Sequence, residues 1–171
     1  PQARDLNIPG RELKGVYLAL ELLSQQNRVL DGCEIAREDL VSCRDKDVLV
    51  IGGGDTGSDC IVTAHRQGCR IVTQIEIMPK TPVGPEDPAN PWPGYPRTLK
   101  TTSSHEEGCI RRWNINTLEF VGKDGSLSGV RVQPIDWKPN PEGGRPLMVE
   151  AGEPELLDVQ VVLLAMGFLK P

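Results

Sequence analysis

Histidine is scarce in this sequence, and its cysteines are scattered. The 171 residues contain two histidines, His65 and His105, which are too few for an ordinary multi-histidine metal site. No C-x-x-C pair is present, although this pair is the usual mark of zinc sites and of thioredoxin-type redox centres. We therefore expect no metal ion, and we expect free thiols in a reducing cytoplasm at the five cysteines Cys33, Cys43, Cys60, Cys69 and Cys109.

Long apolar runs and an excess of positive charge are also lacking. No apolar stretch approaches the roughly 20 residues that are needed to span a bilayer. The formal net charge is -5 at pH 7, whereas affinity for nucleic acid depends on concentrated Lys and Arg. We therefore expect neither a membrane nor a nucleic acid as a partner.

The sequence shows no start methionine and no targeting leader. Its length suits one compact domain, residues 1–171. Because the chain begins at Pro1 and stops at Pro171 directly after an apolar run, we expect this domain to be a fragment of a longer polypeptide. We assign residues 1–46 to a leading helix with its connector and residues 47–171 to the core of the domain.

Hydrophobic patterning in the first half predicts alternating helices and strands. An amphipathic helix is predicted by apolar residues at helical spacing, namely Leu13, Val16, Tyr17, Leu20 and Leu23. Residues 48–51 are a short, apolar, β-branched run that is typical of a buried parallel strand. A helical pattern then runs from Asp55 towards Gly68, and residues 70–77 resemble a second strand. This order predicts a βαβ unit.

The second half is predicted to be rich in β structure. Residues 79–96 hold so many prolines and glycines that we expect a long loop, either functional or a simple surface excursion. Two strands, 115–121 and 129–137, should pair as a hairpin, and Pro134 should make the second an edge strand or a broken one. The last run, 159–167, is apolar enough for a central strand that is buried on both faces.

The glycine-rich turn after the first core strand is the motif that indicates chemistry. Gly52, Gly54 and Gly57 fit the pattern G-x-G-x-x-G, with a strand before it and a helix after it. In this motif the glycines permit a tight turn, the approach of a pyrophosphate and close packing of the helix. The alternative is a flexible turn with an ordinary helix cap. We favour an α/β fold, a Rossmann-like parallel sheet with flanking helices and an inserted β hairpin or meander, and a pyrophosphate site at Gly52, Gly53, Gly54, Asp55, Thr56 and Gly57.

Glu76 lies about 20 residues beyond the motif, where such a fold reads the adenosine ribose. A carboxylate there accepts hydrogen bonds from the ribose hydroxyls and repels a 2'-phosphate, which favours NADH. Arg66 and Lys80 are the nearby cations that could instead reach the 2'-phosphate of NADPH. Their alternative roles are a cation at a helix C-terminus and a solvated loop charge. NADH is the favoured nucleotide, and NADPH stays open.

Residues 105–107, His-Glu-Glu, stand close to Arg111 and Arg112. Their spacing matches no metal site and no catalytic triad. We interpret them as part of a charged helix that is followed by basic residues, so no catalytic residue is assigned.

At the level of longer segments, the chain resembles the small (beta) subunit of glutamate synthases. The segments that carry the resemblance are IPGRELKGV, VLVIGGGDTGSDC, HRQGC, TQIEIMP, NPWPGYP, SSHEEGC, RRWNINTLEF and VVLLAMGF, and they run through nearly the whole chain. The motif GGGDTG alone would indicate some dinucleotide-binding flavoprotein. Its combination with SSHEEGC and LLAMGF is much more specific.

The resemblance implies an NAD(P)H-binding domain that is inserted into an FAD-binding domain of the same parent chain. It places Ala165, Met166 and Gly167 near the flavin and the nicotinamide. It further implies an oxidoreductase that passes electrons through FAD and iron–sulfur clusters to a large (alpha) subunit, which forms glutamate from glutamine and 2-oxoglutarate. The clusters and the FAD belong to the parent subunit, so we expect this chain alone to bind nucleotide without completing the reaction.

Two other functions fit part of the sequence. The first is the nucleotide-binding domain of another FAD and iron–sulfur reductase, of the ferredoxin or pyrimidine reductase type. The second is a non-catalytic nucleotide sensor, for which no residue speaks directly.

Overall fold

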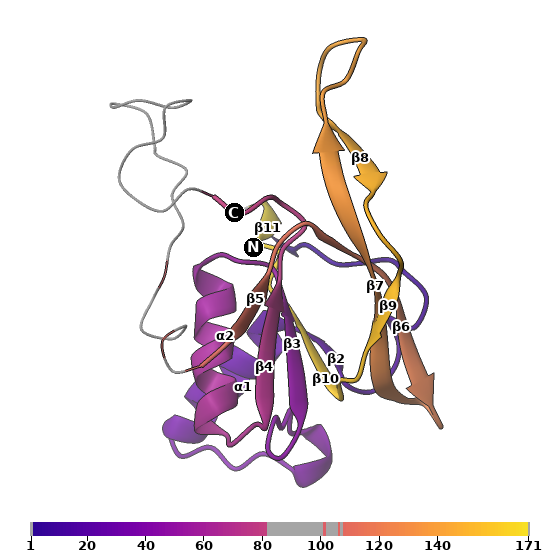
Figure 1. Cartoon of the computed structure of the whole chain (residues 1–171). Coiled ribbons are helices and arrows are strands. Elements are labelled where there is room, and N and C mark those ends of the chain that lie inside the picture. Colours follow the sequence, from indigo (N-terminus) through magenta and orange to yellow (C-terminus); the bar gives the residue numbers. More distant parts are fainter. Residues whose placement is uncertain (1, 82–100, 102–105, 107, 171) are drawn as a thin grey trace, which may run out of the picture.

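The computed structural model describes residues 2–81, 101, 106 and 108–170, and it has three layers (Figure 1). A parallel sheet forms the middle layer, two helices cover one of its faces, and antiparallel strands cover the other. The α/β fold with an inserted β meander is therefore confirmed. Most of the proline-rich loop lies outside the described residues, as do His105 and Glu107.

The middle sheet has five parallel strands in the order β2-β10-β3-β4-β5. The strands are β2 (Val16–Leu18), β10 (Val161–Leu164), β3 (Asp47–Ile51), β4 (Ile71–Ile75) and β5 (Ile110–Arg112). All four residues of β10 are buried, and this strand pairs with β2 on one side and with β3 on the other. The predicted central strand is thus confirmed.

The leading helix begins later than the sequence pattern predicts. α1 spans Ala19–Leu30, while Val16 and Tyr17 lie in β2. Gly15 has a φ of +119°, which a helix cannot accommodate, and β2 is held by its register with β10. Helical spacing of the apolar residues is therefore overridden by pairing between strands. A short 3₁₀ helix, η1 (Arg37–Asp39), lies in the connector.

Both described helices lie on the same face of the parallel sheet. α1 joins β2 to β3, and α2 (Asp55–Arg66) joins β3 to β4, so both connections move across the sheet in one direction. Because such crossovers are right-handed, they place both helices on the same face. The prediction of helices around the sheet is correct for this face, and strands take the place of helices on the other.

Alternation along β3 builds a core on each face of the sheet. Val48 and Val50 pack with the helices, in a cluster that includes Leu22 and Ile61. Leu49 and Ile51 point the other way and pack with the antiparallel strands. A strand that is covered on both faces needs apolar residues at every position, which explains the unbroken apolar run in the sequence.

The antiparallel layer is the predicted hairpin with two additional strands. It comprises β6 (Ile115–Lys123), β7 (Ser126–Lys138), β8 (Leu147–Glu150) and β9 (Glu155–Leu157). Asp124 and Gly125 form the two-residue turn between β6 and β7, both with positive φ. The short strands β1 (Gln2–Ala3) and β11 (Phe168–Lys170) pair beside the parallel sheet (Figure 1).

The prediction for Pro134 is wrong, because β7 is continuous and pairs on both sides. β7 pairs with β6 along one side, and on the other side with β9 and then β8. Pro134 falls between the residues that pair with β9 and those that pair with β8. Its missing N–H is therefore placed where the neighbouring strand is interrupted.

No helix among the described residues is long and apolar enough to cross a membrane.

Gly52 provides a test of how tightly the turn after β3 is packed. Its φ is +116°, and a Cβ there would overlap the carbonyl oxygen of Ala165. Gly32 also has a positive φ, of +82°, but a Cβ at that position would meet no atom within 4 Å. We expect Gly32→Ala to lower the free energy of unfolding by roughly 1–2 kcal/mol, the cost of the backbone conformation alone. Gly52→Ala should cost roughly 1–3 kcal/mol more because of overpacking.

Denaturant unfolding of the two variants measures this difference. Equal losses of stability would show that the turn can move away from Ala165.

Candidate functional site

A pocket of about 680 Å³ lies at the carboxyl edge of the parallel sheet. Its walls come from the ends of β3, β4 and β10, from the start of β6 and from the N-terminal segment. Eight of the predicted site residues line it, namely Gly52, Gly53, Gly54, Thr56, Glu76, Ala165, Met166 and Gly167. In open α/β sheets this edge is where ligands bind.

Gly52 and Gly57 allow the turn after β3 to pack against its neighbours without side chains. A Cβ on Gly57 would lie 2.8 Å from the carbonyl oxygen of Gly52, so α2 approaches the turn as closely as the third glycine of the motif permits. The amide of Gln74 donates to that same carbonyl oxygen at 2.8 Å. The turn is therefore held between the segment that follows β10 and the buried strand β4.

Gly53 lies against the carboxyl group of Glu76, and Gly54 borders open space. A Cβ on Gly53 would overlap the carboxyl group of Glu76, so Gly53 leaves room for that side chain. A Cβ on Gly54 would meet no atom within 4 Å. Gly54 is the N-cap of α2, and its carbonyl accepts the first helical bond from Ser58 N at 3.1 Å. Amide groups and the dipole at such a helix start favour an anion.

Glu76 directly follows β4 and lies half-buried in the pocket wall. Its backbone N–H donates to the carbonyl of Arg112, and its carbonyl accepts from the N–H of Ile115, both at 2.9 Å. Burial raises the pKa of the Glu76 carboxyl, while the positive charge of Arg111 acts in the opposite direction. A hydroxyl donor at this carboxylate would offset the cost of its burial.

The segment after β10 brings its three predicted residues to the glycine turn. Ala165 N donates to Ile51 O at 2.8 Å, which continues the pairing between β10 and β3. Gly167 has a φ of +80°, and its carbonyl accepts from Arg4 N at 2.9 Å. Residues 165–167 therefore form one wall of the pocket, beside the turn that ends β3.

Four predicted residues do not line this pocket. Arg66 ends α2, and 12 helical residues with a rise of about 1.5 Å each separate the two ends of this helix by roughly 16 Å. Arg66 therefore lies at the opposite end of α2 from the glycine turn, and its part in binding a nucleotide stays a prediction. Lys80 is exposed, with its Nζ 5.0 Å from the centre of the Trp113 ring. Asp55 and Gly57 lie in the first turn of α2, where Asp55 is exposed and Gly57 is buried, and neither lines the pocket.

Several residues complete the pocket wall that no motif in the sequence predicted. They are Arg4, Asp5, Leu6, Ile51, Ile77, Met78, Ile115, Asn116, Thr117 and Leu169. Ile77 and Met78 directly follow Glu76 in the sequence, and this position could have predicted them as pocket residues. No local signal marks Arg4 or Asp5, because tertiary contacts alone bring the N-terminal segment beside Gly167.

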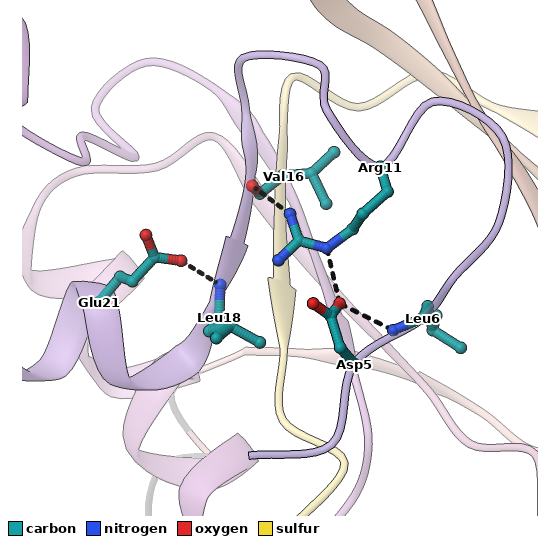
Figure 2. Close-up of polar contacts among 6 residues, drawn as sticks. All are labelled: Asp5, Leu6, Arg11, Val16, Leu18 and Glu21. Carbon is teal, nitrogen blue, oxygen red and sulfur yellow. Dashed lines mark hydrogen bonds and ion pairs between the residues drawn. The ribbon is translucent and has the colours of Figure 1, made fainter. Parts of the chain in front are cut away.

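An ion pair fixes Asp5 within this N-terminal segment (Figure 2). Arg11 Nε lies 2.6 Å from Asp5 Oδ1, and Leu6 N donates to the same oxygen at 2.8 Å. The hydrogen bond from Arg11 holds the pKa of Asp5 below its ordinary value. The negative charge of Asp5 is therefore offset by Arg11, and Arg4 contributes a positive charge to the pocket wall.

Comparison with known proteins gives a consistent picture. The family model for pyridine nucleotide-disulphide oxidoreductases matches residues 2–88. The chain is 43% identical to the glutamate synthase [NADPH] small chain of Mycobacterium tuberculosis, over 98% of this chain and 34% of that protein. It is 36% identical to the glutamate synthase [NADH] of Schizosaccharomyces pombe, over 98% of this chain and 8% of that protein. The chain thus spans about a third or less of these relatives.

Solved structures share the fold at low sequence identity. FprA of Mycobacterium tuberculosis in complex with NADPH aligns with a TM-score of 0.68 and 14% identity, over 98% of this chain and 48% of that chain. Thioredoxin reductase of Streptococcus pyogenes aligns with a TM-score of 0.57 and 18% identity, over 97% of this chain and 41% of that chain. The chain belongs to the pyridine nucleotide-disulphide oxidoreductase family.

Proposed function

We propose that this chain binds NADH or NADPH in the pocket and presents the nicotinamide to FAD on another domain of the same parent chain. One observation carries the proposal: the glycine turn, a carboxylate beyond the second strand and the segment after β10 line a single pocket. These are the three elements that hold the pyrophosphate, the adenosine ribose and the nicotinamide end in our sequence hypothesis. Family membership supports the same class of ligand.

The pyrophosphate would lie against Gly54 and the first turn of α2. Gly54 offers space for an approaching group, and Thr56 lines the same wall. The helix start supplies a favourable dipole, and Arg4 supplies a positive charge from the N-terminal segment. The residues present therefore fit a dinucleotide. The bound nucleotide would supply the hydride, and the protein would bind and orient it.

Glu76 would select the nucleotide at its ribose. Ribose hydroxyls can donate to its carboxylate, whereas a 2'-phosphate would meet a negative charge. The names of the relatives do not decide the matter, since one carries NADPH and another NADH. The position of Glu76 in the pocket wall favours NADH in this proposal.

In the parent protein, this domain would serve as the nucleotide-binding part of a glutamate synthase small subunit. FAD and iron–sulfur clusters would be held elsewhere in that subunit, and electrons would pass to the large subunit for glutamate synthesis. The identity to the small chain of Mycobacterium tuberculosis over nearly the whole chain supports this assignment. All five cysteines are described and none forms a disulfide, which fits the cytoplasm that we propose as the location.

A second candidate is the equivalent domain of another FAD-dependent reductase. The fold that the chain shares with FprA and thioredoxin reductase favours it, because the same architecture serves different electron acceptors. The flanking sequence of the parent protein would distinguish the two.

The substitution Gly54→Val tests the pyrophosphate position. The φ of Gly54 is -80° and a Cβ there would meet no atom within 4 Å, so valine should lower the free energy of unfolding by only about 1 kcal/mol, the cost of a poorer N-cap. The side chain would occupy the space proposed for the pyrophosphate, and we expect NADH binding to be lost. Equilibrium titration should show a graded series, with Gly54→Ala between the wild type and Gly54→Val. Unchanged affinity in folded Gly54→Val would place the pyrophosphate elsewhere.

The substitution Glu76→Ala tests nucleotide choice. It removes a charge-assisted hydrogen bond worth roughly 1.5–3 kcal/mol for NADH, together with the charge that repels a 2'-phosphate. The ratio of NADH to NADPH affinity should therefore fall about tenfold or more. Titrations with each nucleotide at one fixed ionic strength give this ratio. Glu38→Ala, an exposed change in η1, is the control for the altered net charge.

The pH dependence of binding tests the protonation state of Glu76. Burial raises the pKa of this carboxyl in the free chain, and ribose donors would lower it again in the complex by favouring the ionised form. Affinity should therefore fall as the pH is lowered through the pKa of the free chain, with uptake of a proton when ligand leaves. ADP-ribose carries the same adenosine ribose and serves as the ligand. The slope should vanish in Glu76→Gln, and a persisting slope would assign it to another group.

A further inference from the structure

Residues 76–78, the segment that carries Glu76, are held by backbone hydrogen bonds to residues 112–115. Ile115 N donates to Glu76 O at 2.9 Å, Asn114 N donates to Met78 O at 3.2 Å, and Glu76 N donates to Arg112 O at 2.9 Å. The three partners are the last residue of β5, the first residue of β6 and Asn114 between the two strands. Residues 76–78 therefore continue the sheet pairing past the end of β4, where the strand itself stops at Ile75.

A further bond to this segment comes from a side chain. Trp137 Nε1 donates to Ile77 O at 3.0 Å, across 60 positions of the sequence. Trp137 is the penultimate residue of β7, and its indole is half-buried. The bond depends on the continuity of β7 past Pro134, because that continuity extends the strand to the carboxyl edge of the parallel sheet.

We propose that Trp137 is a positioning residue for nucleotide selection, which fixes residues 76–78 so that the Glu76 carboxyl stays against Gly53 and faces the pocket. The inference rests on the proposed function, in which Glu76 reads the ribose. Trp137 does not line the pocket and acts through the backbone of Ile77. The indole thus affects the choice between NADH and NADPH without contact with either nucleotide.

Two neighbours explain why the position of Glu76 needs to be fixed. On one side, Gly53 has no side chain, and the carboxyl group fills the space next to its Cα. In addition, the positive charge of Arg111 acts on Glu76, and it lowers the pKa of this carboxyl and favours its ionised form. A looser segment would let the carboxylate move towards Arg111. Such a move weakens both its hydrogen bond to the ribose and its repulsion of a 2'-phosphate.

The substitution Trp137→Phe tests this inference, because it keeps an aromatic ring and removes the N–H donor. Losing one neutral hydrogen bond should reduce the NADH-to-NADPH affinity ratio about three- to tenfold, less than Glu76→Ala does. In the chain without nucleotide, hydrogen exchange at the amides of Glu76 and Ile115 should become several-fold faster. Hydrogen exchange therefore reports how firmly residues 76–78 are held, independently of ligand binding.

The control is Met148→Leu, since Met148 is the cross-strand partner of Trp137 on β8. It alters packing near the indole and leaves the N–H donor, so neither the ratio nor the exchange should change. A double variant, Trp137→Phe with Glu76→Ala, separates positioning from a general loss of structure. We expect its NADH-to-NADPH affinity ratio to equal that of Glu76→Ala alone, because the hydrogen bond from Trp137 affects selectivity only through the Glu76 carboxylate.

Several outcomes would overturn the inference. An unchanged ratio in Trp137→Phe, an equal loss of affinity for both nucleotides, or the same change in Met148→Leu would each assign Trp137 to stability alone. Failure of the wild-type chain to bind either nucleotide would refute the proposed function itself. Wild-type binding with unaltered selectivity in Trp137→Phe would refute the inference about Trp137 and leave that function standing.

Discussion

The close approach of the turn after β3 to the segment after β10 is the constraint on which the pocket depends. Gly52 lies so near the carbonyl of Ala165 that no side chain fits between them. This contact aligns the end of β3 with residues 165–167, and the bond from Gln74 to Gly52 O ties the same turn to β4. Three strand ends therefore meet at one point. The glycine turn and residues 165–167 are therefore held side by side in the pocket wall.

The two carboxylates in the pocket wall, Asp5 and Glu76, each have an arginine whose charge acts on them. The pair of Asp5 and Arg11 offsets one negative charge in the wall, so the N-terminal segment contributes Arg4 to the balance (Figure 2). Glu76 is treated differently, because it is half-buried and has the charge of Arg111 nearby. A wall with one offset carboxylate and one that can respond to a ligand suits a molecule with an anionic centre and a hydroxyl-bearing end.

Local patterns in the sequence predicted the elements that depend on neighbouring residues. The strand before the glycine turn, the α2 helix, the hairpin of β6 and β7 and the apolar last strand all follow from short-range rules. Errors arose where distant segments decide. Val16 is a strand residue because of β10, and Pro134 is tolerated because its neighbouring strand is interrupted. Arg4 reaches the pocket, and Trp137 reaches the backbone of Ile77, through tertiary contacts that no sequence window contains.

The place of β10 in the sheet has a consequence for synthesis and folding. β2 and β3 do not pair with each other, since β10 lies between them and is the last strand of the parallel sheet along the chain. A nascent chain that emerges from the ribosome therefore carries two unpaired parallel strand edges until β10 has been synthesised. Closing such distant contacts is entropically costly and slow. The pocket and the parallel sheet are thus completed by the same late event, the pairing of β10 with β2 and β3.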